Sequence, residues 1–272
     1  MERNDIAKIL LSTVLGLILM VGMTLYIDSR VTEAPYEPPP VEEIVLASPQ
    51  ELLQTTEPEP LVSFNTELGV YDCSSGCTLA AVDKQHGLPP DYIPAGMISL
   101  LKGRGTMIPE AAAQADLLLD ALRNEHGVNV EVISSYRSSQ SQQNVYNDWI
   151  ETYESRGLSY GTAIKEANKI SALPGHSEHQ LGTTLDIKTA GTTTFDKAQN
   201  AELYGLIEEF AHIYGFVISY PEGLEEQTGY LYEPWHIRYI GPENATKLYN
   251  LGYLTGSGQY LSKFLREQNL SD

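Results

Sequence analysis

The sequence predicts an α+β domain built on a small, mainly antiparallel sheet with flanking helices. Segments with helical periodicity precede and separate short runs rich in β-branched residues. The connections between these segments are irregular and contain glycine. The chain has 272 residues, and its hydrophobic fraction of 42% is sufficient for a packed core.

The N-terminal segment has the composition of a membrane anchor. Residues 9–27 are uncharged and mostly apolar, and as a helix they would extend about 28 Å, close to the thickness of the hydrocarbon core. The run is long for a cleaved signal peptide, and no small-x-small cleavage site follows it, so we expect residues 1–30 to hold a cytoplasmic tip and a transmembrane helix. Arg3 and Lys8 precede the run and only Arg30 follows it before a series of acids, which predicts a cytoplasmic N-terminus and places the chain after residue 30 outside the cytoplasm.

A linker and one further domain are expected after the anchor. Residues 31–66 are rich in proline and acidic residues and poor in aromatic residues, which is typical of an extended linker. No internal repeat or second proline-rich break follows, so we expect one ectodomain over residues 67–272. Outside the cytoplasm, the local pair Cys73 and Cys77 favours a disulfide, and two thiolates alone cannot complete a structural zinc site.

Each element of the ectodomain follows from a local pattern. Residues 109–127 begin with a proline in a first-turn position, carry apolar residues at helical spacing and end at glycine, which predicts a helix. Residues 128–135 alternate β-branched residues and predict a strand, followed by a helix over residues 139–157. Further strands are expected at residues 182–189, 215–220 and 235–241, and further helices at residues 197–215 and 243–253.

The charge of the chain excludes one class of partner. It has 17 Lys and Arg against 36 Asp and Glu, a net charge of −19. Proteins that bind nucleic acid neutralise phosphates with Lys and Arg, so this chain would repel them. We expect no nucleic-acid partner.

A set of polar residues has the composition of a catalytic zinc site. Such sites use three protein ligands, usually His nitrogen and carboxylate oxygen, and leave a fourth position for water. His179 and Asp186 are candidates, because Gly182 between them allows the chain to turn so that both side chains converge. His236 on a predicted strand is the third candidate, with Glu233 three residues before it.

The other four histidines fit simpler interpretations. His126 lies at a helix end and His212 within an apolar helical segment, so both are expected to be structural, and His86 in a turn-rich stretch is expected at the surface. His176 is ambiguous, since its position three residues before His179 allows either a pocket wall or a replacement ligand.

These motifs resemble those of the zinc D-alanyl-D-alanine carboxypeptidases of VanY type, within the wider group of lysostaphin, D-Ala-D-Ala peptidases and sonic hedgehog. The pattern Ser-x-His-x-x-Gly-x-x-x-Asp is met over residues 177–186, Glu-x-x-His over residues 233–236, and Tyr-Arg-Ser-x-x-x-Gln over residues 136–142. The resemblance covers residues 78–265. The sequence departs from the pattern at Thr184, where alanine is usual, and at Ser135, where glycine is commoner.

The resemblance implies a hedgehog/D,D-peptidase-like fold and a role for each matched residue. His179, Asp186 and His236 would bind one zinc ion, and Glu233 would act as general base and then acid. Arg137 would stabilise the developing oxyanion or hold the substrate. The remaining matched side chains would contact the substrate, and Ser177 and Gln142 would donate hydrogen bonds to its terminal carboxylate; this substrate-binding set comprises Ser177, Gln142, Tyr136 and Ser138.

The function implied is a membrane-anchored zinc D,D-carboxypeptidase that removes the C-terminal D-Ala from peptidoglycan stem peptides. An L,D-carboxypeptidase or a peptidoglycan endopeptidase would share the same ligands and base and differ only in the pocket walls. A non-catalytic zinc-containing binding module is the alternative from another class. Glu233 disfavours that alternative, because a module without catalysis needs no carboxylate at this spacing.

Overall fold

The centre of the domain is a four-stranded antiparallel sheet. The computed structural model describes residues 63–74 and 76–269. The order of the sheet is β5-β6-β8-β7, and each neighbouring pair is antiparallel. Its strands are β5 (Val130–Ser134), β6 (Thr184–Thr189), β7 (Phe216–Ile218) and β8 (His236–Tyr239). The predicted α+β class with a small antiparallel sheet is confirmed.

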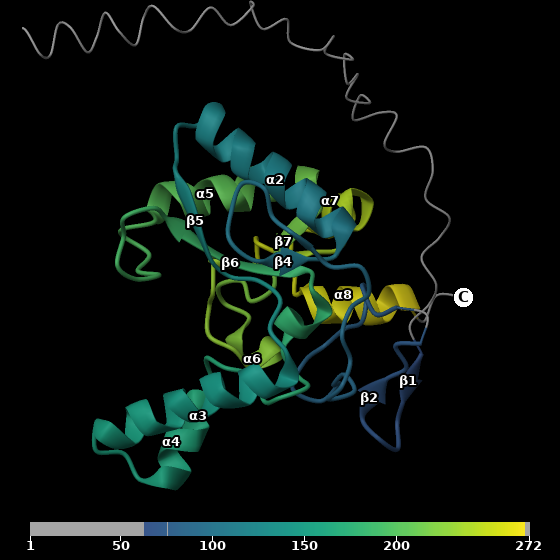
Figure 1. Cartoon of the computed structure of the whole chain (residues 1–272), viewed down its shortest axis with the longest axis vertical. Helices are drawn as coiled ribbons and strands as arrows, with labels where there is room; N and C mark the ends of the chain where they lie inside the picture. The colour runs from purple at the N-terminus through teal and green to yellow at the C-terminus, as the bar shows by residue number, and fades with distance from the viewer. Residues whose placement is uncertain (1–62, 75, 270–272) are drawn as a thin grey trace, which may run out of the picture. The chain divides into compact units, whose positions relative to one another are not determined.

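Three helices cover one face of this sheet. Figure 1 shows α2 (Pro109–Asn124), α5 (Ala201–Phe210) and α7 (Pro242–Asn250) together on this face. Helix α2 begins at a first-turn proline and buries a stripe of alanines and leucines, because these residues recur at helical spacing. The stripe joins the buried side chains of the sheet, such as Ile187 and Phe216, in the main hydrophobic core.

Two further helices form a hairpin with a small core of its own. Helix α3 (Ser139–Ser155) begins at Ser138, whose hydroxyl caps it by accepting a hydrogen bond from the Ser141 amide. It packs against α4 (Tyr160–Ala167) through a buried cluster separate from the main core. Figure 1 shows the hairpin projecting from the body on the side of the sheet away from α2.

Short hairpins and helices complete the domain. Strands β1 (Phe64–Asn65) and β2 (Val70–Tyr71) pair antiparallel, as do β3 (Ile98–Ser99) and β4 (Thr106–Met107). The remaining segments are the 3₁₀ helices η2 (Glu178–Leu181) and η3 (Ala211–Tyr214) and the helices α6 (Glu225–Thr228) and α8 (Leu261–Asn269).

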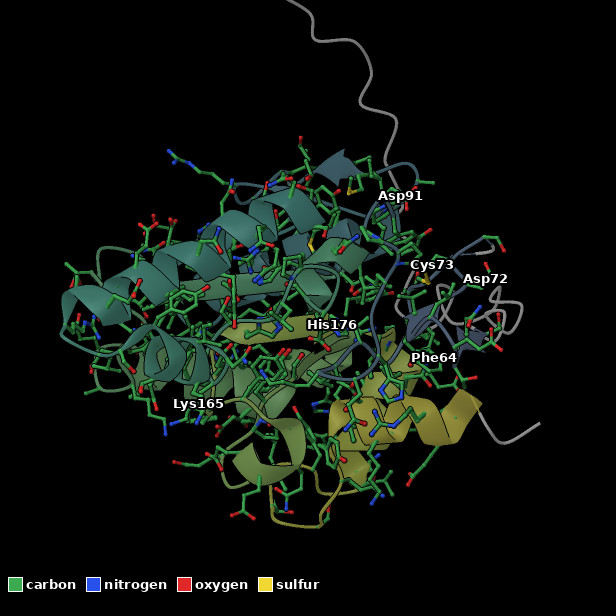
Figure 2. All side chains as sticks on the ribbon, turned by 90° about the horizontal axis from the view of Figure 1, so that it is seen from below. Phe64, Asp72, Cys73, Asp91, Lys165 and His176 are labelled. Atoms are coloured by element: carbon green, nitrogen blue, oxygen red, sulfur yellow. A yellow bond between two sulfur atoms is a disulfide. The ribbon has the colours of Figure 1, made fainter. Side chains whose placement is uncertain are left out.

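The predicted disulfide is confirmed. Cys73 and Cys77 are bonded, with a Cα–Cα distance of 5.1 Å. In Figure 2, Cys73 lies with Asp72 and Phe64 at one edge of the domain, and Lys165 on α4 lies toward the opposite edge. Cys77 is fully buried, so the bond fixes the loop after β2 to the main core.

Some sequence expectations lie outside the described residues or shift in position. The expected anchor at residues 9–27 and all but the last residues of the expected linker are outside the part of the chain that the structure describes. Within the described ranges, no helix is both long and apolar enough to cross a membrane. Strand β1 precedes residue 67, where the ectodomain was expected to begin, because Phe64 already pairs with Tyr71.

Gly215 provides a test of the packing around β7 and β8. It ends η3 with φ +81, and a Cβ there would lie 2.6 Å from a ring carbon of Tyr239 and 2.9 Å from the backbone of Gly241. Gly191 has a similar φ of +86 with open space around it. We expect Gly191→Ala to cost about 1 kcal/mol of unfolding free energy from backbone strain alone, and Gly215→Ala about 2 kcal/mol more from the clash. Urea denaturation of both variants measures this difference, and equal losses would contradict the packing described.

Candidate metal centre

The three candidate ligands come from three elements that the fold brings together. Asp186 lies on β6 and His236 begins β8, and the two residues are direct partners in the antiparallel register. His179 lies on η2, which ends at Gly182 in the left-handed region with φ +69 before the chain enters β6. Glycine adopts this conformation without the steric cost of a side chain, so the short turn returns His179 to Asp186.

The distances between the ligand atoms fit a metal ion. His179 Nε2 lies 3.1 Å from Asp186 Oδ2, and His236 Nδ1 lies 3.0 Å from Asp186 Oδ1. All three ligand atoms lie within 4.8 Å of one another. Tetrahedral zinc with bonds of about 2.0–2.1 Å separates its ligands by about 3.3 Å, so small adjustments suffice to bind it. Among the described residues, no other group of three or more His, Cys, Asp or Glu side chains lies close enough together to hold a metal ion.

Each histidine is oriented by the nitrogen that does not face the centre. His179 Nδ1 lies 2.7 Å from the Ser135 carbonyl oxygen, to which it donates, so the Nε2 lone pair is free to bind a metal. His236 Nε2 lies 3.1 Å from Glu178 Oε2, which leaves Nδ1 toward the centre. The two rings therefore present different nitrogens to the same point.

A buried ion pair supports His236 from behind. Arg238 is fully buried on β8, and its Nη1 donates to Glu178 Oε1 at 2.8 Å. Its Nη2 donates to the carbonyl oxygens of Thr78 at 2.9 Å and Ala80 at 2.7 Å. Burial would raise the pKa of Glu178, but the Arg238 guanidinium and His236 lower it to about 2. Glu178 is therefore an anion, which suits it to hold the His236 ring.

The electrostatics of the ligands favour a bound cation. Burial would lower the pKa of His236, but hydrogen bonds to Asp186 and Glu178 raise it to about 10. Burial would raise the pKa of Asp186, but His179 and His236 hold it below its ordinary value. The Asp186 carboxylate thus stabilises a positive charge at His236 Nδ1. That charge can be a proton or a divalent cation, and the two compete for the Nδ1 lone pair.

Glu233 and Arg137 lie at the same centre. Glu233 Oε2 lies 4.0 Å from His236 Nδ1, and the side chain is buried. Burial and the charge of Asp186 raise the pKa of Glu233 to about 8, although His236 opposes this. Burial lowers the pKa of Arg137, while Asp186 and Glu233 oppose this shift. Within the described residues the Arg137 guanidinium forms no ion pair, and its buried Nε has no hydrogen-bond partner.

Of the four expected substrate-binding residues, Ser138 and Gln142 are engaged in hydrogen bonds within the protein, and Ser177 and Tyr136 lie beside the candidate site residues in sequence. Ser177 is buried at the start of η2, and Tyr136 is half-buried next to Arg137. Ser138 already serves as the cap of α3. Gln142 is buried, and its Nε2 donates to Ser171 Oγ at 3.1 Å and to the Ala172 carbonyl at 2.7 Å.

The Gln142 geometry changes the role expected for this residue. Both N–H groups are engaged within the protein, and the atom without a partner is Oε1. An amide oxygen accepts hydrogen bonds, so with both N–H groups engaged Gln142 has no donor left for a carboxylate. Sequence spacing could not reveal this, because Ser171 and Ala172 lie about thirty residues away.

The remaining histidines lie outside the metal cluster. His126 stacks on Phe210 and His212 stacks on Tyr249, in agreement with structural roles. His86 was expected at the surface but is half-buried, with Nδ1 2.7 Å from Asp83 Oδ1. His176 Nδ1 lies 2.8 Å from the Asp83 carbonyl oxygen, which gives this ring a structural partner.

Glu178 and Arg238 support the candidate site, and the sequence alone did not indicate this. Each is adjacent to a ligand in sequence or on the same strand face: Glu178 precedes His179, and Arg238 lies two residues after His236. A period-2 reading of β8 would have placed Arg238 on the same face as His236. Nothing in the sequence pairs it with a carboxylate sixty residues earlier.

Comparison with known proteins identifies the family of this site. Residues 105–242, half of the chain, match the family model described as "VanY: D-alanyl-D-alanine carboxypeptidase". The chain belongs to the VanY family. A relative, the D-alanyl-D-alanine carboxypeptidase of Enterococcus faecalis, is 35% identical over 175 residues, which are 64% of this chain and 63% of the relative. The chain thus covers less than two thirds of the length of that relative.

Solved structures of the VanY family share the fold. VanYB in complex with D-alanine-D-alanine is 32% identical, has a TM-score of 0.60 and covers 70% of this chain and 97% of its own. A mutant of the vancomycin resistance D,D-pentapeptidase VanY in complex with Zn(II) is 31% identical, has a TM-score of 0.60 and covers 69% of this chain and 98% of its own.

The buried ion pair behind His236 provides a test of the site's support. Removing one partner of a buried pair leaves the other charge uncompensated, so we expect Arg238→Met to cost about 3–5 kcal/mol of unfolding free energy. As a control, Lys247→Met breaks the exposed Lys247–Glu243 pair and should cost less than about 1 kcal/mol. Chemical denaturation measures both, and an Arg238→Met loss as small as that of the control would refute the role assigned to this pair.

Proposed function

We propose that this chain is a zinc D,D-carboxypeptidase that removes the C-terminal D-Ala from peptidoglycan stem peptides. The observation that carries the proposal is the convergence of His179, Asp186 and His236, with Glu233 4.0 Å from His236 Nδ1. Membership of the VanY family and the Enterococcus faecalis relative support the reaction. Two VanY-family structures, one with D-Ala-D-Ala and one with Zn(II), support the substrate and the metal.

The donor set of this chain fits zinc. Two imidazole nitrogens and one carboxylate oxygen are the ligand types of catalytic zinc sites, which keep a fourth position open. The hydrogen bonds that the two rings donate to the Ser135 carbonyl and the Glu178 carboxylate hold both rings with the ligand nitrogens toward Asp186. When bound, zinc supplies a Lewis acid that activates water and polarises the scissile carbonyl.

Glu233 and Arg137 perform the proton transfer and the charge stabilisation. The Glu233 carboxylate takes a proton from the attacking water and delivers it to the nitrogen of the leaving D-Ala. Burial, which favours the protonated carboxyl, suits Glu233 to hold that proton between the two steps. The Arg137 guanidinium, with an unpartnered Nε, donates to the oxygen that gains negative charge.

The position of the enzyme in the cell follows from its N-terminal sequence. The apolar run at residues 9–27 anchors the chain in the membrane with the N-terminus in the cytoplasm. The acidic, proline-rich residues after the anchor hold the catalytic domain at the outer face, where peptidoglycan stem peptides are available. The disulfide between Cys73 and Cys77 supports this assignment, because such bonds persist outside the reducing cytoplasm.

Glu233→Gln separates catalysis from metal binding. The amide keeps the shape of the side chain but cannot take a proton, so turnover of a D-Ala-D-Ala stem peptide should fall about 100-fold or more. Zinc content, measured by elemental analysis, should stay at one ion per chain, because Glu233 is not among the ligands. Near-native turnover by Glu233→Gln would show that another residue is the base.

Substrate recognition by an exopeptidase requires a free carboxylate. Desolvating that anion is costly unless donors receive it, and Arg137 and Ser177 are the matched residues with donors for it. A stem pentapeptide ending in a C-terminal amide should be hydrolysed about 30- to 150-fold more slowly, in kcat/KM, than the free acid.

The control for this experiment is a stem tetrapeptide, with products identified by mass. Loss of one D-Ala from the pentapeptide, with the tetrapeptide left intact, is the result expected of a D,D-carboxypeptidase. Cleavage of the tetrapeptide alone would establish L,D-carboxypeptidase activity instead. Equal rates on the pentapeptide acid and amide would establish an endopeptidase.

A further inference from the structure

A lysine outside the matched catalytic motifs lies between two segments that lead to the metal centre. Lys84 lies in the irregular segment between β2 and β3, and its side chain is half-buried. Its ammonium nitrogen lies 3.4 Å from the ring centroid of Tyr230 and donates a hydrogen bond to the Asn168 carbonyl oxygen. The loop of Tyr230 carries Glu233, and the segment after Asn168 leads to His179.

The ring below Lys84 begins a stack that ends at a metal ligand. The Tyr230 ring centroid lies 4.4 Å from that of Tyr220, which lies 4.9 Å from that of His236. Tyr220 also holds the base loop directly, because the Glu233 amide donates to the Tyr220 carbonyl oxygen at 3.0 Å. Tyr220 therefore contacts the Tyr230 ring, the His236 ring and the backbone of Glu233.

The chain makes room for this lysine. Gly229 has φ +76, and a Cβ there would lie 2.9 Å from Lys84 Cε and 3.2 Å from its Cγ. Beside it, the Leu231 amide donates to the Lys169 carbonyl oxygen at 2.9 Å, so the same two segments are also joined through the backbone. Asn168 is held in turn by the Tyr146 hydroxyl, which donates to its Oδ1 at 3.0 Å.

The burial of an ammonium here is costly and calls for a role that depends on charge. Burial lowers the pKa of Lys84 to about 8, while the charge of Glu233 opposes the shift. An apolar side chain of similar length would fill the same space without that desolvation cost. What it could not provide is the attraction of a cation to the face of Tyr230 together with a hydrogen bond to Asn168.

We infer that Lys84 is a positioning residue, which joins the Tyr230–Tyr220 stack to the segment beginning at Asn168 and thereby sets the His236 ring and the Glu233 backbone. Its hydrogen bond and its ring contact go to Asn168 and Tyr230, neither of which is a candidate ligand or the candidate base. An effect of Lys84 on kcat rests on the proposed function, whereas an effect on the geometry of the metal ligands does not. The experiment has one arm for each.

The first arm is kinetic, on a D-Ala-D-Ala stem peptide. Lys84→Met should lower kcat about 10- to 100-fold with KM changed less than about 3-fold, because a small misplacement of a base costs rate more than binding. Lys84→Arg, which keeps the cation and its donors, should recover most of kcat. The matched control is Lys197→Met, which removes an exposed cation whose nitrogen lies 3.8 Å from the ring centroid of Tyr232 and should leave kcat unchanged.

The second arm needs no activity. Purified protein is loaded with Co²⁺ in place of zinc, and its visible absorption reports the geometry of the ligand atoms. Lys84→Met should shift the absorption bands and weaken Co²⁺ affinity, Lys84→Arg should restore both, and Lys197→Met should match the wild type. If the wild type cleaves no stem peptide, the proposed function fails while the Co²⁺ spectra still decide the role of Lys84.

Two outcomes would overturn the inference. One is a Lys84→Met protein with wild-type kcat and Co²⁺ spectrum. The other is a kcat loss that Lys84→Arg does not recover and that parallels the loss of folded protein by circular dichroism, which is the behaviour of a purely structural residue. Should Lys84→Met fail to fold, Tyr230→Leu and Tyr230→Phe replace it. Leucine removes the aromatic face and should lower kcat and shift the spectrum, whereas phenylalanine keeps that face and should do so less; equal values for the two would reject the inference.

Discussion

The buried pair between Glu178 and Arg238 is the interaction on which the arrangement of this site depends. Arg238 is fully buried, and Glu178 is 2% exposed. The guanidinium donates to the 78–80 segment and to Glu178, and Glu178 in turn contacts His236 and accepts from Ser219. One cation on β8 thus connects the 78–80 segment with the 3₁₀ helix η2 and, through Glu178, with the residue that follows β7. A carboxylate at this depth is tolerable only because its oxygens have such partners.

The pairing register of the sheet is the second constraint. Asp186 opposes His236 across β6 and β8, and Thr184 opposes Arg238 two residues along. A slip of one residue would turn the whole face of a strand over, and would separate both the metal ligands and the supporting ion pair. The buried apolar partners on the other face, such as Leu185 opposite Ile237, resist that slip. Core packing and site geometry are therefore set by the same hydrogen bonds.

The sequence predicted the central elements because they are long or strongly patterned. The alanine and leucine stripe of α2 and the β-branched run of β5 were both recognisable, as was the short β8. Helix α4 was missed because its eight residues bury only Ala163 and Ala167, too few to give a clear period. The two-residue strands β1 and β2 exist only through the pairing of one with the other, which no local pattern encodes.

The clustering of the three candidate ligands could be predicted because the residue types and spacing are restrictive, and the resemblance of the motifs added the roles that remain predictions. The supporting residues could not, because they are defined by contacts between distant segments. Lys84 reaches a carbonyl 84 positions later, and Arg238 reaches one 160 positions earlier. For Gln142 the motif indicated a hydrogen-bond donor to the substrate. Contacts with a distant segment, which the sequence does not reveal, already engage both of its N–H groups.

The α3–α4 hairpin has a hydrophobic core of its own, so it can open independently of the central sheet. Tyr146, Ile150, Ala163 and Ala167 pack on one another and not on the main core. A unit with its own cluster can open locally while the sheet remains folded, and amide exchange in the two regions would then proceed by different openings. We therefore expect an insertion in the turn at residues 156–159 to leave the candidate ligands undisturbed. The other end of the hairpin lacks this freedom, because Asn168 at the end of α4 accepts hydrogen bonds from both Tyr146 and Lys84.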